Sequence, residues 1–149
     1  MMPFRKFSMV LLLAAALMLL LPPAWAAAQV NIGIKTILAS NDQQYEDPQL
    51  KGIIDELQTV FRFTAYRLLK QDHLSLRTGE TGNVNLPGGR ILSVTPTGNR
   101  GNRTQMALQI SKQNRQIFET RIELLKRGTI TVGGPRHANG YLLLNITSK

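Results

Sequence analysis

Apolar and polar residues alternate along most of the second half of the chain. TQMALQIS, from 104 to 111, places Met106, Leu108 and Ile110 on one side, and QIFETRIELL, from 116 to 125, continues the pattern. A period of two residues is typical of a β-strand that buries one face. Short turn-forming runs separate such segments, as in an antiparallel meander. We therefore predict a mainly antiparallel sheet that is solvated on one face.

Further strands are predicted on either side of this region. RILSVTP (90–96), TITV (129–132) and YLLLNIT (141–147) are short runs rich in β-branched and apolar residues. VNIGIKTIL (30–38) also alternates, except that Ile37 interrupts the pattern. We expect this first strand to join one edge of the sheet, with its second face partly covered.

One segment has the period of a helix instead. In EDPQLKGIIDELQTVFRFTAYRLLKQ (46–71), apolar residues recur at spacings of three and four, which gives one apolar stripe. Asp47 can accept hydrogen bonds from free amides as the N-cap, and Pro48 suits the first helical position. We predict one amphipathic helix that ends near Lys70 or Gln71.

The apolar stripe of the helix and the apolar face of the sheet each need a partner. An α+β domain, with one amphipathic helix packed on a mainly antiparallel β-meander sheet, satisfies both needs. A small β-barrel or sandwich with one helix is the alternative fold. We see no domain boundary in the sequence after residue 30, so residues 27–149 are expected to form a single domain.

The first 26 residues have the three parts of a cleaved signal peptide. Arg5 and Lys6 form a basic start, residues 9–21 are all apolar, and Ala24-Trp25-Ala26 offers small residues for cleavage. The apolar run is short for a membrane span, which needs about 20 residues. We expect cleavage after Ala26, a mature chain without a transmembrane segment, and export to the periplasm or the medium. An uncleaved N-terminal anchor is the alternative.

Positive charge is concentrated in the second half of the chain. Residues 30–89 carry six basic and seven acidic side chains, whereas residues 90–149 carry ten basic and two acidic ones. Such an asymmetry can mark a surface that contacts anions. For an exported protein, anionic lipid, acidic polysaccharide or an envelope protein is the expected partner. Nucleic acid is not expected, because the basic residues are not interleaved with aromatic ones.

The candidate contact residues lie at or beside predicted turns. They are Arg100, Arg103, Lys126, Arg127, Arg136 and His137. Alternate turns of a meander emerge at opposite ends of the sheet. We therefore expect Arg100 and Arg103 to share one end with Lys126 and Arg127, and Arg136 to share the other end with Lys112 and Arg115.

The sequence offers no recognisable catalytic or metal-binding constellation. There is no cysteine, and His73 and His137 are the only histidines. No residues at metal-ligand spacing accompany them. We expect His73 just past the helix end, pairing with terminal carbonyls. The acidic segment SNDQQYED (40–47) could hold calcium, but it lacks the central glycine and final glutamate of a calcium loop. It is better interpreted as a capped helix entry, so we predict no enzyme activity, no metal and no cofactor.

The glycine-rich stretch VGGPRHANGYLLL (132–144) invites two interpretations. A phosphate-binding loop needs a helix N-terminus behind it, whereas this stretch continues into a predicted strand. Asn139-Gly140 is a strong turn dipeptide. We therefore predict a long hairpin loop that displays Arg136 and His137.

Two functional hypotheses follow from these features. The first is a small, exported, non-catalytic envelope protein that binds a partner protein or an anionic surface, for example as an accessory component of envelope assembly or secretion. Its partner could pair with an exposed sheet edge. The second is a small exported enzyme or ligand carrier that uses the Gly133–Gly140 loop and the acidic segment.

Overall fold

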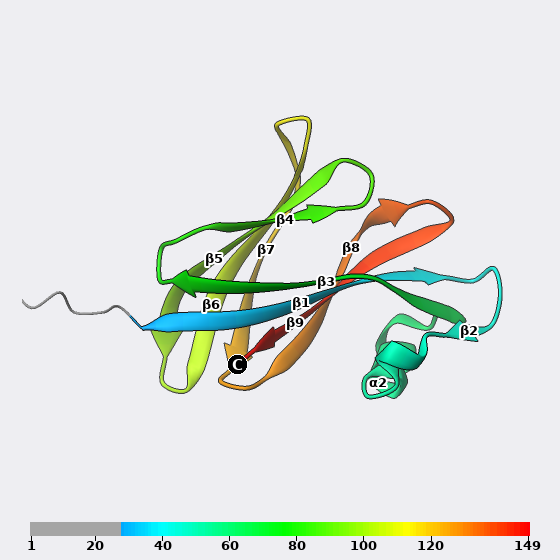
Figure 1. The fold of residues 1–149 in the computed structure, drawn as a ribbon, viewed down its shortest axis with the longest axis horizontal. Helices are drawn as coiled ribbons and strands as arrows, with labels where there is room; N and C mark the ends of the chain where they lie inside the picture. The colour runs from blue at the N-terminus through cyan, green and yellow to red at the C-terminus, as the bar shows by residue number, and fades with distance from the viewer. Residues whose placement is uncertain (1–27) are drawn as a thin grey trace, which may run out of the picture.

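The computed structural model describes residues 28–149, which form two curled sheets and one α-helix (Figure 1). The predicted signal peptide, residues 1–26, lies outside the described residues. The elements are β1 (Gln29–Ser40), β2 (Tyr45–Glu46), the 3-10 helix η1 (Pro48–Leu50), α2 (Ile54–Phe61), β3 (Ala65–Arg77), β4 (Gly82–Leu86), β5 (Arg90–Arg100), β6 (Arg103–Lys112), β7 (Arg115–Leu125), β8 (Thr129–His137) and β9 (Gly140–Ser148). Residues 28–149 are thus mainly β with one α-helix, in agreement with the predicted fold class.

The four-stranded sheet contains the predicted meander strands up to residue 125, whereas the predicted strands 129–132 and 141–147 lie in the other sheet as β8 and β9. Its order β4-β5-β6-β7 follows the chain, and every neighbouring pair is antiparallel. Gln113 and Asn114 both have positive φ at the β6–β7 turn, as a tight hairpin turn that matches the strand twist requires. The inward positions are those expected from the alternation, with Leu92, Leu108 and Ile110 fully buried.

The five-stranded sheet has the order β2-β3-β1-β9-β8. The prediction that the first strand joins an edge is wrong, because β1 lies between β3 and β9 and pairs antiparallel with both. Both of its faces are covered: Ile34 points into the core between the sheets, and Ile37 into a second core on the opposite face. The interrupted alternation at Ile37 therefore did indicate a strand with two covered faces.

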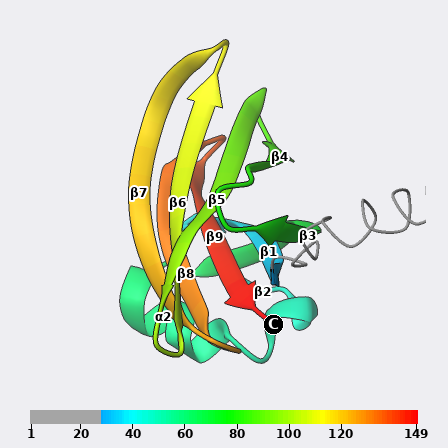
Figure 2. The same ribbon diagram turned by 90° about the vertical axis from the view of Figure 1, so that its left-hand side faces the viewer.

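The molecule has three layers along part of its length. One face of the five-stranded sheet packs on the four-stranded sheet, and its other face packs on α2 at the end where β1 finishes (Figures 1 and 2). The inter-sheet core includes Leu92, Leu108 and Leu144, whereas the helix core includes Leu57 and Leu143. A helix on a sheet was predicted; the second sheet behind it corresponds to the alternative, sandwich-like fold.

The predicted long helix is wrong over most of its length. Asp47 does act as an N-cap, since its Oδ1 accepts a hydrogen bond from the Gln49 amide at 3.0 Å, but it caps only η1. α2 has eight residues and ends at Phe61, and the C-cap residue Arg62 has a left-handed φ of 54°. Ala65 then starts β3, which pairs with β1 from Ser40 to Gln29. Tertiary pairing overrides local helix propensity here.

A β-bulge in β3 explains the misleading pattern. Thr36 pairs with Lys70 and Ile37 pairs with Leu68, so Leu69 is left without a partner on β1. An extra residue shifts the side-chain alternation by one position. Leu68 therefore faces α2, whereas Lys70 faces the four-stranded sheet. Apolar residues on both sides of such a bulge recur at spacings that imitate a helix.

Tyr66 fastens α2 to β3. Its side chain is buried, its hydroxyl donates to the Leu57 carbonyl at 3.0 Å, and the hydroxyl oxygen accepts from the Phe63 amide at 3.1 Å. Burial raises the pKa of Tyr66 above its usual 10.0, and the hydrogen bond from Phe63 opposes this shift. The neutral hydroxyl thus forms hydrogen bonds both with a carbonyl of α2 and with a backbone amide just before β3.

We expect Tyr66→Phe to lower the free energy of unfolding by about 1–3 kcal/mol, because two buried backbone groups lose their partner. Urea unfolding at neutral pH measures this loss. Since the pKa of Tyr66 is higher in the folded chain, its stabilising contribution is complete below pH 10 and declines as the pH rises further. The difference between wild type and variant should therefore shrink in alkaline solution.

The control for this comparison is Tyr141→Phe, because Tyr141 is 39% exposed. That variant should change stability by less than about 0.5 kcal/mol. Equal losses from the two variants would contradict a specific role of the Tyr66 hydroxyl.

Gly140 is required by close packing rather than by its turn. β8 extends to His137 through a bulge after Gly133, so the predicted long loop shortens to a turn at Ala138 and Asn139. Ala138, not Gly140, has the positive φ. A Cβ on Gly140 would collide with the Ala39 carbonyl of the central strand.

We expect Gly140→Ala to destabilise the protein by about 3 kcal/mol, because the backbone of β1 has no room to move away. Gly98→Ala is the matched control, since the nearest atom to its added Cβ would lie 4.0 Å away. That control should stay within about 0.5 kcal/mol of wild type. Thermal and urea unfolding compare the two, and a tolerated Gly140→Ala would show that β9 can shift on β1.

Candidate functional site

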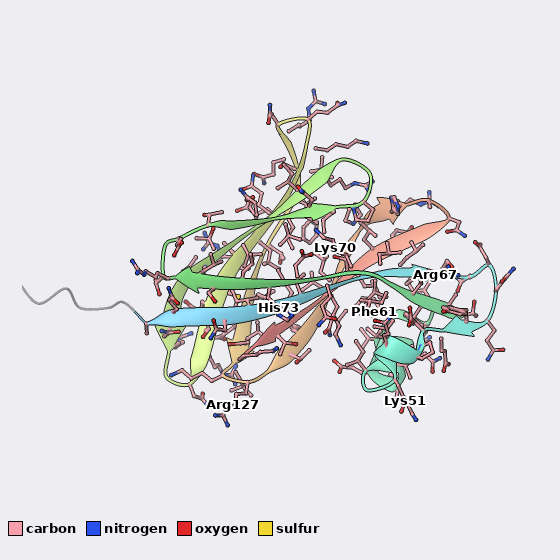
Figure 3. The ribbon with its side chains drawn as sticks, in the orientation of Figure 1. Lys51, Phe61, Arg67, Lys70, His73 and Arg127 are labelled. Atoms are coloured by element: carbon pink, nitrogen blue, oxygen red, sulfur yellow. The ribbon has the colours of Figure 1, made fainter. Side chains whose placement is uncertain are left out.

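Four of the six predicted contact residues share one end of the molecule. Arg100 pairs with Arg103 at the β5–β6 turn, and the Lys126 amide donates to the Asn102 carbonyl at 2.8 Å. The turn between β7 and β8 is thereby tied to the β5–β6 turn. We call the exposed set Arg100, Arg103, Lys126 and Arg127 the basic rim (Figure 3 labels Arg127).

The charges of the basic rim are almost uncompensated. Glu123 lies 3.6 Å from Arg103, and it is the one carboxylate that forms an ion pair with the rim in the described part of the chain. Leu125, beside the rim, is 47% exposed. Four cations and an apolar side chain on neighbouring turns form a surface suited to anions.

Arg136 and His137 lie at the opposite end and point to opposite faces of the five-stranded sheet. Arg136 pairs with Tyr141, and its Cζ lies 5.6 Å from the centroid of the Tyr141 ring on the face that α2 covers. His137 pairs with Gly140 and faces the four-stranded sheet. The two predicted residues therefore do not converge on one ligand.

Arg90 connects the two sheets at this end. Its Nη2 donates to the Arg136 carbonyl at 2.6 Å, its Nη1 donates to the Pro87 carbonyl at 3.2 Å, and Nη1 lies 3.4 Å from Nδ1 of His137. Sequence reasoning missed this residue. The signal was its position two residues before Leu92, which gives it the inward parity of its strand.

His73 does not lie beyond a helix end, contrary to prediction. It sits within β3, opposite Gly33 on β1, and is exposed (Figure 3). No helix terminus is near it in sequence, because α2 has already ended at Phe61. A pairing of His73 with terminal carbonyls is therefore excluded.

An ion pair lies on the inner face of β3. Lys70 Nζ is 3.1 Å from Asp72 Oδ1 and donates to the Asn85 carbonyl of β4 at 3.1 Å. It is the main polar link between β3 and β4, which belong to different sheets. The ion pair follows from the bulge at Leu69, since the bulge turns both charged side chains inward.

The acidic segment is used mainly for structure. Asp47 also accepts from the Leu68 amide through Oδ2 at 3.1 Å, and Glu46 accepts from the Gln58 side chain. The capped entry is therefore confirmed. No group of three or more histidine, aspartate or glutamate residues in 28–149 is arranged to hold a metal ion.

A pocket of about 320 Å³ joins the acidic segment to the β8–β9 turn. We call it the Arg67 pocket; it is lined by Leu38, Ser40, Asp42, Gln43, Tyr45, Ala65, Arg67 and Asn139. Ser40 pairs with Ala65 on one side and Gly140 on the other, which brings these distant segments together. Neither Arg136 nor His137 lines it.

The chain matches no protein-family model, no curated protein and no solved structure. Within residues 28–149, neither helix is long and apolar enough to cross a membrane. Functional inference therefore rests on the basic rim, the Arg67 pocket and the sheet edges.

We expect Arg90→Ala to lower the free energy of unfolding by about 1–3 kcal/mol, because the Arg136 carbonyl loses a charged donor. Hydrogen exchange should accelerate in residues 134–141. Arg121→Ala, at an exposed position of β7, is the control and should cost less than about 0.5 kcal/mol. Unchanged exchange in that hairpin would rule out Arg90 as a connection between the sheets.

Proposed function

We propose that this protein is a small, exported, non-catalytic component of the cell envelope that attaches to an anionic surface through the basic rim. Export rests on the signal-like residues 1–26, and attachment rests on the rim. The surface would be acidic lipid headgroups or an acidic polymer, in which many anionic groups lie side by side.

The observation that carries the proposal is the convergence of two turns. Arg100 and Lys126 are 26 positions apart in sequence, yet the hydrogen bond between Lys126 and Asn102 holds their turns together at 2.8 Å. Cations held on a rigid scaffold lose little entropy on binding. Each basic side chain near an anionic membrane contributes about 1 kcal/mol to attachment.

The basic residues at the opposite end of the molecule are less suited to bind an anionic surface. Arg90 is occupied by bonds that connect the sheets, and Arg136 lies over Tyr141. Lys112 and Arg115 are exposed and pair with each other at the β6–β7 turn, but they belong to a single hairpin. These two residues supply a matched control, because removing them changes the net charge as much as removing two rim residues does.

We expect the double variant Arg100→Gln/Lys126→Gln to bind phosphatidylglycerol-containing vesicles about tenfold to thirtyfold more weakly than wild type. Lys112→Gln/Arg115→Gln should bind within about threefold of wild type. Vesicle sedimentation at several salt concentrations measures both, and binding of wild type should weaken as salt rises.

Equal losses from the two double variants would mean that net charge, not the rim, drives attachment. Wild type that binds neither these vesicles nor an anionic polysaccharide resin would overturn the proposal.

A second candidate function, binding of an envelope protein, is favoured by β7. Among residues 28–149 this strand pairs with β6 alone, and Ile117 in its first half is 43% exposed. An unpaired edge can accept an extended segment of another protein. Arg115 is the first residue of β7. If Lys112→Gln/Arg115→Gln no longer captures an envelope protein, while Arg100→Gln/Lys126→Gln still does, the result would favour protein binding at β7 over surface attachment through the basic rim.

A further inference from the structure

We propose that the Arg67 pocket binds a small zwitterionic ligand, a free amino acid or a short peptide. Its carboxylate would contact Arg67 and its ammonium group Asp42. This inference goes beyond attachment to a surface and involves none of the residues of the basic rim. It rests on the shape of the pocket and on the two opposite charges that line it.

Two small residues form the floor of the pocket. Ser40 on β1 and Ala65 on β3 both line it and pair with each other, and Ser40 pairs on its other side with Gly140 of β9, next to the lining residue Asn139. Leu38, two residues before Ser40 on the same face, adds an apolar surface. The depression thus follows from the register of three strands, and its floor suits an apolar side chain.

Side chains and a turn make the walls. Arg67 pairs with Leu38, and Tyr45 pairs with Ala65, so both rise on the β2–β3 side (Figure 3 labels Arg67). Asp42 and Gln43 come from the segment that joins β1 to β2, and Asn139 comes from the β8–β9 turn. Three separate segments therefore surround the floor with polar groups.

Arg67 is held in place yet keeps its hydrogen-bonding capacity. Its Cζ lies 4.9 Å from the centroid of the Tyr45 ring, so the ring supports the guanidinium group through a cation–π contact. Neither ion pair found between residues 28 and 149 involves Arg67. A supported guanidinium with free donors is suited to bind a carboxylate through two parallel hydrogen bonds.

Asp42 is the acidic counterpart. Asp47 and Glu46, in the same segment, accept hydrogen bonds from other parts of the protein, whereas Asp42 takes part in neither ion pair of the described chain. It lines the Arg67 pocket without pairing with Arg67. Two opposite charges that face one cavity without meeting call for a ligand that carries both.

The other ligand classes fit less well. A simple anion would gain from Arg67 but would be repelled by Asp42, and a simple cation would meet the reverse problem. A volume of about 320 Å³ is near the lower limit for small-molecule sites, which favours a compact ligand over a polymer. Ser40, Gln43 and Asn139 can bond the remaining polar atoms.

Three probes that share the leucine side chain but carry different charged groups test the proposal. They are L-leucine, which is zwitterionic, N-acetyl-L-leucine, which keeps only the carboxylate, and L-leucinamide, which keeps only the ammonium group. Binding of each probe to the full chain, in the form recovered from the expressing cell, is measured by isothermal titration calorimetry or NMR. We expect L-leucine to bind at least about tenfold more tightly than either derivative, since each lacks one charged contact.

Substitutions of the two exposed residues Arg67 and Asp42 test which charged group of the ligand each one contacts. Arg67→Gln should weaken L-leucine binding about tenfold and should also weaken binding of N-acetyl-L-leucine, because both probes carry the carboxylate. Asp42→Asn should weaken L-leucine binding similarly. Of the two derivatives, it should weaken binding of L-leucinamide and not of N-acetyl-L-leucine. Arg100→Gln, in the basic rim, is the control and should leave all three affinities unchanged.

Several outcomes would overturn the proposal. They are no saturable binding of L-leucine, equal affinities for the three probes, tightest binding of a singly charged derivative, or binding that survives both Arg67→Gln and Asp42→Asn. Because the control variant alters the rim and not the pocket, failure here is distinguishable from failure of surface attachment, which the vesicle experiment measures.

Discussion

The burial of β1 on both faces is the constraint on which the rest of the structure depends. Ile34 and Ile37 belong to the two separate cores, and β3 and β9 pair with β1 on its two sides. The chain has no cysteine, so no disulfide limits its unfolded states and the two cores must provide the stability. A strand that touches every layer makes those cores one cooperative unit.

The bulge at Leu69 reconciles this constraint with the composition of β3. Without the bulge, Lys70 and Asp72 would face α2 together with Tyr66, because alternate residues of a regular strand lie on the same face. The extra residue lets Tyr66 and Leu68 cover the helix core, while Lys70 and Asp72 turn toward β4. Both side chains stay partly exposed, Lys70 by 40% and Asp72 by 22%, so they keep contact with water. Their ion pair at 3.1 Å and the bond from Lys70 to the Asn85 carbonyl position them between the sheets.

Local patterns predicted those features that depend on a few neighbouring residues. The meander from β4 to β7, the Asp47 cap and the division of the basic turns between two ends were all readable from alternation, turn residues and chain order. The helix boundary, the central place of β1 and the position of His73 were not. Each depends on the β1–β3 register, and a bulge that shifts register leaves a sequence pattern that resembles a helix.

The Arg67 pocket could not be predicted for the same reason. Asp42, Arg67 and Asn139 are separated along the chain, and none stands in a motif. Only the pairing of Ser40 with both Ala65 and Gly140 brings them together. The hypothesis based on the Gly133–Gly140 loop named two segments that border the pocket, the acidic one and the β8–β9 turn, but Arg136 and His137 do not line it.

The two proposed surfaces lie near opposite ends of the β8–β9 hairpin, and that placement bears on how they would work together. β9 begins at Gly140 beside the pocket and ends at Ser148, whose amide bonds the Gly128 carbonyl next to the basic rim. Nine strand residues span roughly 30 Å. A protein attached by the rim would therefore hold the Arg67 pocket away from the anionic surface, beyond several Debye lengths at physiological salt. The mixed charges of the pocket would then meet a ligand from solution without competition from the surface that the rim binds.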